Sequence, residues 1–513
     1  MAKSKNKKKS KRTELAAREI ELRVAPILEV QYTEPLFTVA AHPTEPVIVS
    51  GLATGHVYCN RYDAEALEDQ QRRERERIAS SIRSVSQLKN KWWEVTNYDA
   101  AKGSLYTTLW KTKRHKGSCR SVIFDPTTSN AGKYIYTVGS DNVIKKATAE
   151  TGKVASKVDI VKEYQSKGDS VTKLCHSSTH DFLLAGTENG LVLVFDSKNL
   201  GSSIKYSVAE AHEDAINHIL PMPHVSAYHY LTLGLTTLSH IDIRKGIITQ
   251  SDNQEDELLS MCYPTDDTMN DTVLVGHGEG IVTIWKNSKN KFMDQLSRIK
   301  VNKGVSIDCI VPSMNEDLPE SVWCGDSDGF LHRLDYRKGK VVETRLHSNA
   351  TEKHGAIDEV GILDIDYNYR LISAGMDSLK IWSGSGNEEQ PEAEVDDESD
   401  DDSEDSADDM ENSDKEDNSD SDSDINDDSD SESDLNESDS DGSSENDSKA
   451  KSVNEKKRKV VDINKLTAKG NEHGEEKEES EPARPKKKVK QLSTKQLRNL
   501  QRHEHGIKRF DGL

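Results

Sequence analysis

A short cassette recurs along this chain and limits what the chain can fold into. In residues 274–285 an apolar pair leads into Gly276, a tight turn follows, and a β-branched run ends on Trp285. Related cassettes occupy residues 183–196, 322–335 and 371–382. Period-two alternation of apolar residues around a turn of Gly, Asn and Asp predicts two strands joined by a hairpin. One hairpin cannot bury its faces in water, but several stacked around an axis can, which predicts a β-propeller.

One glycine in each cassette gives the number of blades. The glycines that open the predicted turns are Gly51, Gly139, Gly186, Gly234, Gly276, Gly325 and Gly375. Their successive gaps are 88, 47, 48, 42, 49 and 50 residues, against roughly 40–45 for a four-stranded WD-type blade. We therefore predict an all-β fold, a single seven-bladed propeller over residues 24–385. The run 27–32 is placed to supply the outer strand of the last blade, so that the ring closes through its own ends.

The first gap is twice as long as the others and requires an insertion. Residues 64–91 are charged, lack glycine and favour a helix, so we predict a helical insertion between the third and fourth strands of blade one. Trp92 and Trp93 could anchor its end against the blade. An eighth blade is the alternative, but this stretch has no alternating β-branched pattern.

Charge is segregated along the chain, whose net charge is −22. Residues 387–450 hold 31 Asp or Glu and 2 Lys, whereas the middle section, 24–386, is only about −7. We therefore expect the acidity to belong to a tail and not to a binding face of the propeller. Like-charge repulsion and few apolar residues predict a disordered acidic Ser/Asp/Glu tract over 386–450. The excess of Lys and Arg at the two ends of the chain predicts a basic disordered arm over 1–23 and a basic disordered tail over 451–513.

The basic tail carries two compact clusters typical of a nuclear import signal. They consist of Lys456, Lys457, Arg458 and Lys459, and of Lys486, Lys487, Lys488 and Lys490. The last stretch, 493–513, has apolar residues on a basic background, which predicts either a short helix that folds onto a partner or a frayed tail.

No catalytic or metal-binding pattern is present in the sequence. The chain lacks a phosphate-binding glycine loop, a nucleophile elbow and a zinc-protease motif, and His503 and His505 are wrongly spaced for zinc on one helical face. The six cysteines form no CxxC or Cys/His pair, which predicts buried reduced thiols. No run approaches the ~20 apolar residues that span a bilayer. We expect a protein that is not an enzyme and that uses no cofactor, metal, membrane or small-molecule substrate.

The cassettes resemble the WD-repeat family of propellers. In that family a His, a Ser or Thr, an Asp and a Trp of one blade form a structural hydrogen-bond network. The positions that resemble it are His115, Asp141, His212, Trp285, Ser373, Asp377 and Trp382. Most blades depart from the pattern, with Asn60 and Ala147 where Trp would stand.

A closer resemblance rests on residues 34–43 and 50–59, the acidic tract, the basic clusters and the ending 510–513. These are similar to the nucleolar WD-repeat protein fifty-five family, whose fungal members are called Jip-five. The resemblance implies a nucleolar scaffold in ribosomal RNA processing and large-subunit biogenesis. Its partners would be ribosome assembly factors or ribosomal proteins bound to the acidic tract, together with pre-ribosomal RNA bound to the basic arms.

Two other functions remain open from the sequence. Asp242 with Arg244, and Asp335 with Arg337, resemble the WD-x-R box that docks propellers on a cullin-type ubiquitin ligase adaptor, although Trp is missing from both. The two pairs fall in blades four and six rather than in neighbouring blades, and local pairing at strand ends is the alternative reading. The acidic tract could also serve a histone chaperone.

Overall fold

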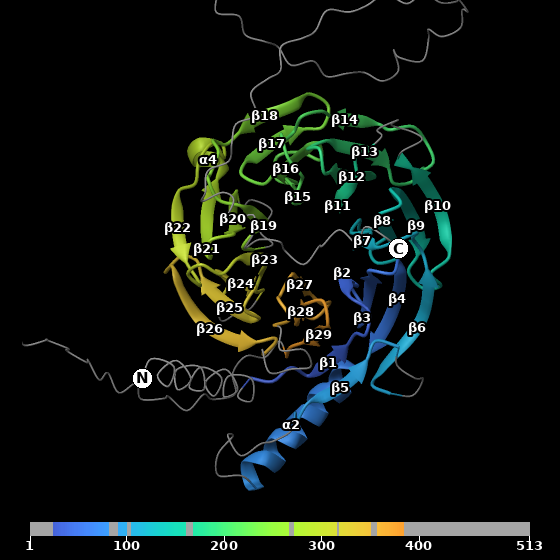
Figure 1. Ribbon diagram of the computed structural model, residues 1–513, viewed down its shortest axis with the longest axis vertical. Helices are drawn as coiled ribbons and strands as arrows, with labels where there is room; N and C mark the ends of the chain where they lie inside the picture. Colours follow the sequence, from blue (N-terminus) through green and yellow to red (C-terminus); the bar gives the residue numbers. More distant parts are fainter. Residues whose placement is uncertain are drawn as a thin grey trace, which may run out of the picture. The chain divides into compact units, whose positions relative to one another are not determined.

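Seven antiparallel sheets surround an axis in the computed structural model, which describes residues 24–81, 91–99, 104–160, 168–265, 271–314, 318–349 and 357–383 (Figure 1). The innermost strand of each sheet contacts those of its two neighbours, and the seventh contacts the first. The ring is therefore closed, and the predicted seven-bladed propeller is confirmed.

The first four blades follow one another along the chain. Blade one contains β2 (Leu36–Ala41), β3 (Val47–Leu52), β4 (His56–Tyr62) and β6 (Tyr106–Lys113). Blade two contains β7 (Cys119–Phe124), β8 (Tyr134–Gly139), β9 (Val143–Thr148) and β10 (Val154–Asp159). Blade three contains β11 (Val171–His176), β12 (Phe182–Thr187), β13 (Val192–Asp196) and β14 (Tyr206–Val208). Blade four contains β15 (His218–Pro221), β16 (His229–Leu233), β17 (Leu238–Asp242) and β18 (Gly246–Gln250).

The last three blades complete the ring. Blade five contains β19 (Leu258–Cys262), β20 (Thr272–His277), β21 (Ile281–Lys286) and β22 (Ser297–Lys300), with the short helix α4 (Asn287–Asn290) between its last two strands. Blade six contains β23 (Ile307–Pro312), β24 (Ser321–Asp326), β25 (Phe330–Asp335) and β26 (Lys340–Leu346). Blade seven contains β27 (Ile362–Ile365), β28 (Leu371–Ala374) and β29 (Ser378–Ile381), followed in the sheet by β1 (Leu28–Gln31) from the start of the ring.

The N-terminal strand closes the ring as predicted. β1 pairs antiparallel with β29, with Leu28 opposite Ile381 and Gln31 opposite Ser378. Closing through the two ends of the fold covers the edge that an open sheet would leave exposed.

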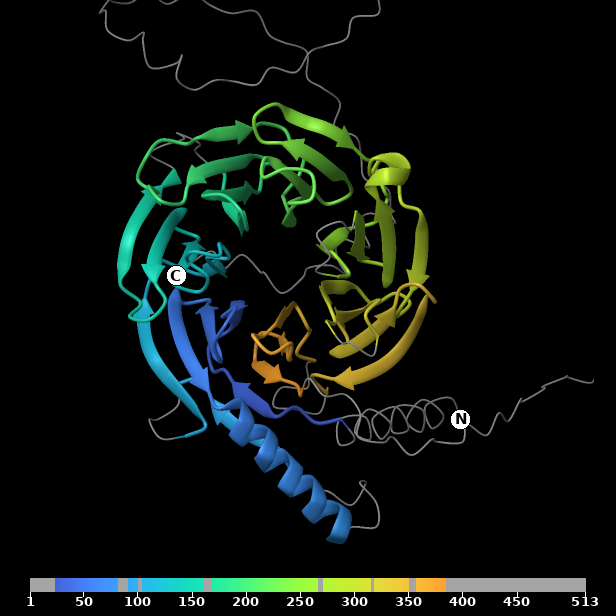
Figure 2. The same ribbon diagram turned by 180° about the vertical axis from the view of Figure 1, so that it is seen from behind.

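The insertion in blade one forms a helix and an unpredicted strand. Helix α2 (Ala64–Ser81) follows β4 directly, which confirms the helical insertion. Strand β5 (Glu94–Asn97) then adds to blade seven as a fifth strand, parallel to β1. The insertion of the first blade therefore reaches across the closing junction, and α2 projects outward from the ring beside it (Figure 2).

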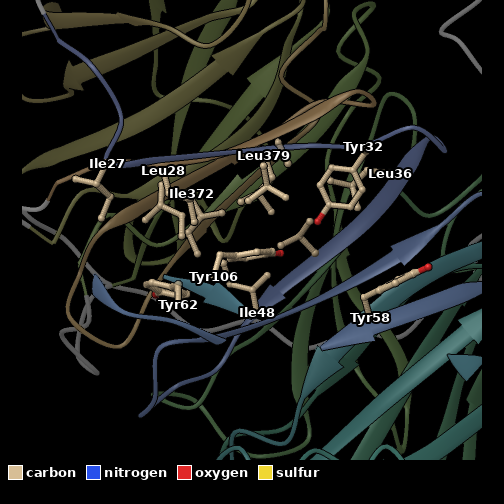
Figure 3. Close-up of a cluster of buried hydrophobic side chains, with 14 of the residues drawn as sticks. Ile27, Leu28, Tyr32, Leu36, Ile48, Tyr58, Tyr62, Tyr106, Ile372 and Leu379 are labelled. Carbon is tan, nitrogen blue, oxygen red and sulfur yellow. The ribbon is translucent and has the colours of Figure 1, made fainter. Parts of the chain in front are cut away.

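The hydrophobic core is divided among the junctions between blades. Seven clusters of buried apolar side chains each combine residues of two neighbouring sheets. At the closing junction, Leu28, Ile372 and Leu379 of blade seven face Tyr62 and Tyr106 of blade one (Figure 3). A blade is therefore stabilised by its neighbours, since fully burying one Leu or Ile side chain contributes about 1.5–3 kcal/mol.

The seven repeat glycines are needed for space and not for an unusual backbone. None of them has a positive φ; the glycines with positive φ lie later in the turns, as at Gly55 and Gly280. A Cβ at Gly51 would lie 2.7 Å from Sγ of Cys119 in the next blade. Gly276 likewise faces Ile307 of the next blade, and the other five glycines face a segment that links two blades. Adjacent blades can approach closely only because these positions lack a side chain.

Candidate functional site: two faces of opposite charge

The chain connections divide into two faces because the strands of each sheet run alternately up and down. Loops that lead from one blade to the next lie beside the turns that join the second and third strands of a blade. Backbone hydrogen bonds tie the two kinds of connection together, as from Ser140 N to Ser118 O (2.9 Å) and from Ser327 N to Ser306 O (3.2 Å). We call this side the linker face and the opposite side, with the remaining turns, the hairpin face.

The linker face is strongly acidic. Its described loops and turns contain only three Lys or Arg, which are Arg114, Lys116 and Lys303. Its sixteen carboxylates, none of them buried, are Glu34, Asp141, Asp169, Glu188, Glu210, Glu213, Asp214, Asp252, Glu255, Asp256, Glu257, Glu279, Asp328, Asp358, Glu359 and Asp377. The expectation that acidity belongs only to the tail is wrong, because a modest net charge over the middle section hides an uneven distribution between the two faces.

The electrostatics of the linker face reflect this crowding. Partial burial raises the pKa of Asp214, and the neighbouring carboxylate of Glu213 raises it further. Partial burial, together with the charge of Asp326, also raises the pKa of Asp328. Carboxylates that are held close together repel one another, which favours the protonated form of each acid. A bound cation would relieve this repulsion, so the linker face is suited to binding positively charged groups.

The hairpin face has the opposite balance. Outside the insertion, its described turns hold eleven Lys or Arg against eight Asp or Glu. Several of these carboxylates are already paired, as in Asp181 with Lys198 (2.6 Å) and Asp366 with Arg370 (3.3 Å). The two faces therefore attract partners of different charge.

Buried histidines serve the structure of the blades. In blade two, His115 Nδ1 lies 2.9 Å from Oδ1 of Asp141, and Nε2 lies 2.9 Å from Oγ1 of Thr137. Burial lowers the pKa of His115, and the bond to Asp141 opposes that shift only in part. In blade four, His212 contacts the hydroxyls of Thr232 and Thr237, both at 2.8 Å. These imidazoles hold a linking loop against its blade.

Blade seven contains a complete network in which Asp358 is the acidic member. The indole Nε1 of Trp382 donates to Oγ of Ser373 (2.8 Å), and His347 Nδ1 lies 2.8 Å from the same oxygen. Asp358 lies 3.6 Å from His347 Nε2. Asp377, the residue selected from the sequence, is exposed and reaches Asp358 through its backbone N–H (3.0 Å). The linking loop, and not the turn, supplies the carboxylate.

Blade five uses a different geometry around Trp285. Its indole donates to Oγ1 of Thr283 on the same strand (2.8 Å), and His277 of the adjacent strand contacts that hydroxyl at 2.7 Å. Asp256, from the linking loop, lies 3.3 Å from His277. This arrangement could not be predicted from the sequence pattern, because the histidine follows Gly276 instead of preceding the blade.

The two adaptor-like pairs lie on the hairpin face, in blades four and six. The buried carboxylate of Asp242 binds Arg244 through both oxygens (2.8 and 3.0 Å). The side chains of Asp335 and Arg337 have different partners: Asp335 contacts Lys338 (3.1 Å) and Arg337 contacts Glu320 (2.8 Å), although the backbone N–H of Arg337 donates to Asp335. Both arginines are exposed, but each already has a carboxylate partner.

Several predictions fall on residues that the structure does not describe. These are the basic arm 1–23, the acidic tract, the two import-like clusters and the predicted C-terminal helix. Among the described residues, no group of three or more His, Cys, Asp or Glu side chains could hold a metal ion. No helix in the described ranges is both long and apolar enough to cross a membrane. All six cysteines are buried and unpaired with one another.

Comparison with known proteins identifies the family. WD repeat-containing protein JIP5 of Scheffersomyces stipitis is 58% identical over 538 positions, which cover 99% of this chain and 100% of the relative. The chain belongs to the JIP5 family of WD repeat-containing proteins. The JIP5 protein of Debaryomyces hansenii is also 58% identical, over 99% of this chain and 100% of its own length. That of Saccharomyces cerevisiae is 40% identical over 73% of this chain and 81% of its own. No model of a known protein family matches the chain.

Membership of the JIP5 family confirms the resemblance drawn from the sequence. The names of these relatives describe a WD-repeat protein and mention no enzyme activity. A WD-repeat propeller acts as a scaffold for contacts between proteins. In this member of the JIP5 family, the acidic linker face is a surface that such contacts could use.

Proposed function

We propose that this protein is a non-enzymatic nucleolar scaffold that acts in ribosomal RNA processing and in biogenesis of the large (60S) ribosomal subunit. The single observation that carries the proposal is the acidic linker face, a rigid array of carboxylates with almost no cations among its described residues. Proteins that bind RNA carry many Lys and Arg side chains. Ribosomal proteins and assembly factors are therefore suitable partners.

Rigidity distinguishes this face from the acidic tract of the same chain. The linking loops are fixed by hydrogen bonds to the turns beside them, as in Gly278 N to Glu257 O (3.0 Å). A basic partner would therefore meet carboxylates in fixed positions, which favours specificity as well as fast association. The acidic tract would add a salt-sensitive, less specific attraction. The two import-like clusters support entry into the nucleus.

The proposal is tested by depleting the protein and following ribosomal RNA by pulse labelling. We expect maturation of the large-subunit RNA to slow, and the wild-type chain to restore it. A chain with E210Q/E213Q/E279Q should restore it poorly, because three exposed carboxylates of the linker face are lost. The matched variant E45Q/E150Q/D294N removes three exposed carboxylates from the hairpin face and should restore it fully. Unchanged maturation after depletion would contradict the proposal.

A further inference from the structure

Two exposed apolar side chains lie on adjoining segments of the linker face, where blade six meets blade seven. Ile357, in the loop that leads from blade six to blade seven, is 36% exposed. Met376, in the turn between β28 and β29, is 38% exposed. Among the described loops and turns of this face, the third large apolar residue that is exposed is Leu235, in blade four. Two of the three therefore belong to one junction of an otherwise acidic surface.

Hydrogen bonds and packing hold the two segments together. The residue after Ile357 is Asp358, whose backbone continues the linking loop. Its Oδ1 accepts hydrogen bonds from the backbone N–H of Met376 (2.6 Å) and from that of Asp377 (3.0 Å). Ile357 also lies against the turn of blade six, because a Cβ added to Gly329 would be 3.1 Å from its Cγ2. The linking loop is therefore fixed between the turns of two neighbouring blades.

Carboxylates surround the apolar pair. Asp328 precedes Gly329 in the turn of blade six, Glu359 belongs to the linking loop, and Asp377 follows Met376. The linking loop and the two turns, as far as the structure describes them, contain no Lys or Arg. We call this set of exposed residues the six–seven patch: Asp328, Ile357, Glu359, Met376 and Asp377.

An apolar centre with a polar rim is the usual anatomy of a surface that binds another protein. The rim of the six–seven patch has a single sign of charge, which restricts the partner. An acidic segment would be repelled by the three carboxylates, whereas a purely basic segment would leave Ile357 and Met376 uncovered. A segment that carries both apolar and basic side chains complements the patch.

We infer that the six–seven patch binds an amphipathic segment of a partner protein that is rich in Lys and Arg. Apolar side chains spaced three and four residues apart on a helix would cover Ile357 and Met376. Lysines and arginines beside them would meet the carboxylates of the rim. The unbranched side chain of Met376 can adjust to the shape of the apolar residue that it receives.

This inference rests on the proposed function for the choice of a basic partner. It deepens that proposal by naming the place on the linker face where the partner is anchored and the sequence pattern that the partner must carry. The anchor lies in blades six and seven, away from the carboxylates of blades four and five that the depletion experiment alters.

The test measures binding of two fluorescein-labelled peptides to the full chain by anisotropy. Both contain only Leu and Lys, in equal numbers; one has Leu at helical spacing, and the other has the same composition in scrambled order. We expect the amphipathic peptide to bind more tightly. I357S/M376S should bind it about tenfold more weakly, since two apolar contacts are lost, and should bind the scrambled peptide within about twofold of wild type.

Matched variants separate the patch from the rest of the surface. V341S/V342S removes two apolar residues of β26 that are 37% and 45% exposed and should bind the amphipathic peptide within about twofold of wild type. D328N/E359Q removes two exposed carboxylates of the rim, so binding should weaken at low salt and depend less on salt. E150Q/D294N removes two exposed carboxylates from the hairpin face and should leave that salt dependence unchanged.

A photoreactive leucine analogue in the amphipathic peptide locates the contact. We expect crosslinks on peptides from residues 318–383. Crosslinks confined to 386–450, or equal binding of the amphipathic and scrambled peptides, would overturn the inference, because the acidic tract would then be capturing any cationic chain. Equal affinity of wild type and I357S/M376S for the amphipathic peptide would overturn it as well. The depletion experiment is independent, since unchanged maturation of ribosomal RNA would contradict the proposed function and leave peptide binding in solution as it is.

Discussion

The closing junction and the junction between blades one and two each bury a charged side chain, with opposite surroundings. At the closing junction Glu29 is 2% exposed. It accepts hydrogen bonds from Lys91 Nζ and Trp93 Nε1, both at 2.9 Å, and lies 3.7 Å from Lys380 Nζ. Arg114, 5% exposed at the other junction, forms no ion pair with any carboxylate that the structure describes. Only the first charge has ion-pair partners among the described residues, so Glu29 acts as a latch across its junction.

The latch depends on the insertion. Lys91 and Trp93 belong to it, and so does Glu68 of α2, which pairs with Arg370 of blade seven (2.8 Å). The ring is thus closed twice, by β1 within the sheet and by the insertion across the junction. Among the described residues, no comparable segment crosses the junction between blades one and two.

The largest effect should come from breaking the latch. Glu29→Ala would leave Lys380 buried with its main partner gone, which we expect to lower the free energy of unfolding by about 3–5 kcal/mol. Urea denaturation measures the loss. Glu188→Ala, which removes an exposed partner of Arg120, should change stability by no more than about 0.5 kcal/mol. Equal effects of the two substitutions would refute the latch.

Acid should weaken the latch in a defined window. Burial raises the pKa of Glu29, but the charges of Lys380 and Lys91 outweigh it and lower the pKa from 4.5 to about 2. A depressed pKa stabilises the fold above the unfolded value, so this contribution, on the order of 3 kcal/mol, is lost as pH falls from about 5 to about 2. We expect Glu29→Gln to flatten the stability profile there. A profile identical to that of wild type would show that other carboxylates govern acid unfolding.

Packing, rather than ion pairing, should hold the one–two junction. Gly51→Ala places a methyl group against Cys119 and Thr38, each 2.7 Å away, and should destabilise by about 1–3 kcal/mol through overpacking. Gly201→Ala is the matched control, because nothing lies within 4 Å of its added carbon. Thermal unfolding of both variants provides the comparison, and equal midpoints would contradict close approach of the blades.

Replacing a buried cation by methionine should change the free energy of unfolding in opposite directions at the two junctions. Arg114→Met removes an uncompensated buried charge while keeping an unbranched side chain, so we expect a gain of about 1 kcal/mol. Lys380→Met leaves Glu29 with fewer partners and should destabilise. Urea denaturation checks both. A loss of stability in Arg114→Met would show that the arginine is compensated after all.

Much of the architecture follows from local pattern. Period-two alternation and the glycine spacing predicted the number of blades, because every blade packs against its neighbours in the same way and therefore repeats the same pattern. The charged, glycine-free stretch after blade one predicted α2. Neither pattern could predict β5, because a four-residue run with three polar residues becomes a strand only where β1 offers an unpaired edge.

The site shows the same limit. Asp377 has the sequence position of a network aspartate, but Asp358 occupies the place in space, because the linking loop folds back over the turn. The acidic linker face was missed because its residues are spread over loops far apart in the chain. Acidic runs such as 210–214 and 252–257 indicate local negative charge, but this was concealed when the charge was summed over the middle section.

By itself, the sequence determined the repeat, the number of blades, the helix and the segregation of charge in the terminal segments. These depend on neighbours along the chain or on the spacing of identical units. Only the tertiary structure decided which groups meet across the junctions, namely Glu29 with Lys380, and Lys145 with the backbone carbonyl of Arg114. Pairing across a junction depends on strand register and on closure of the ring, which bring residues together regardless of their separation in sequence.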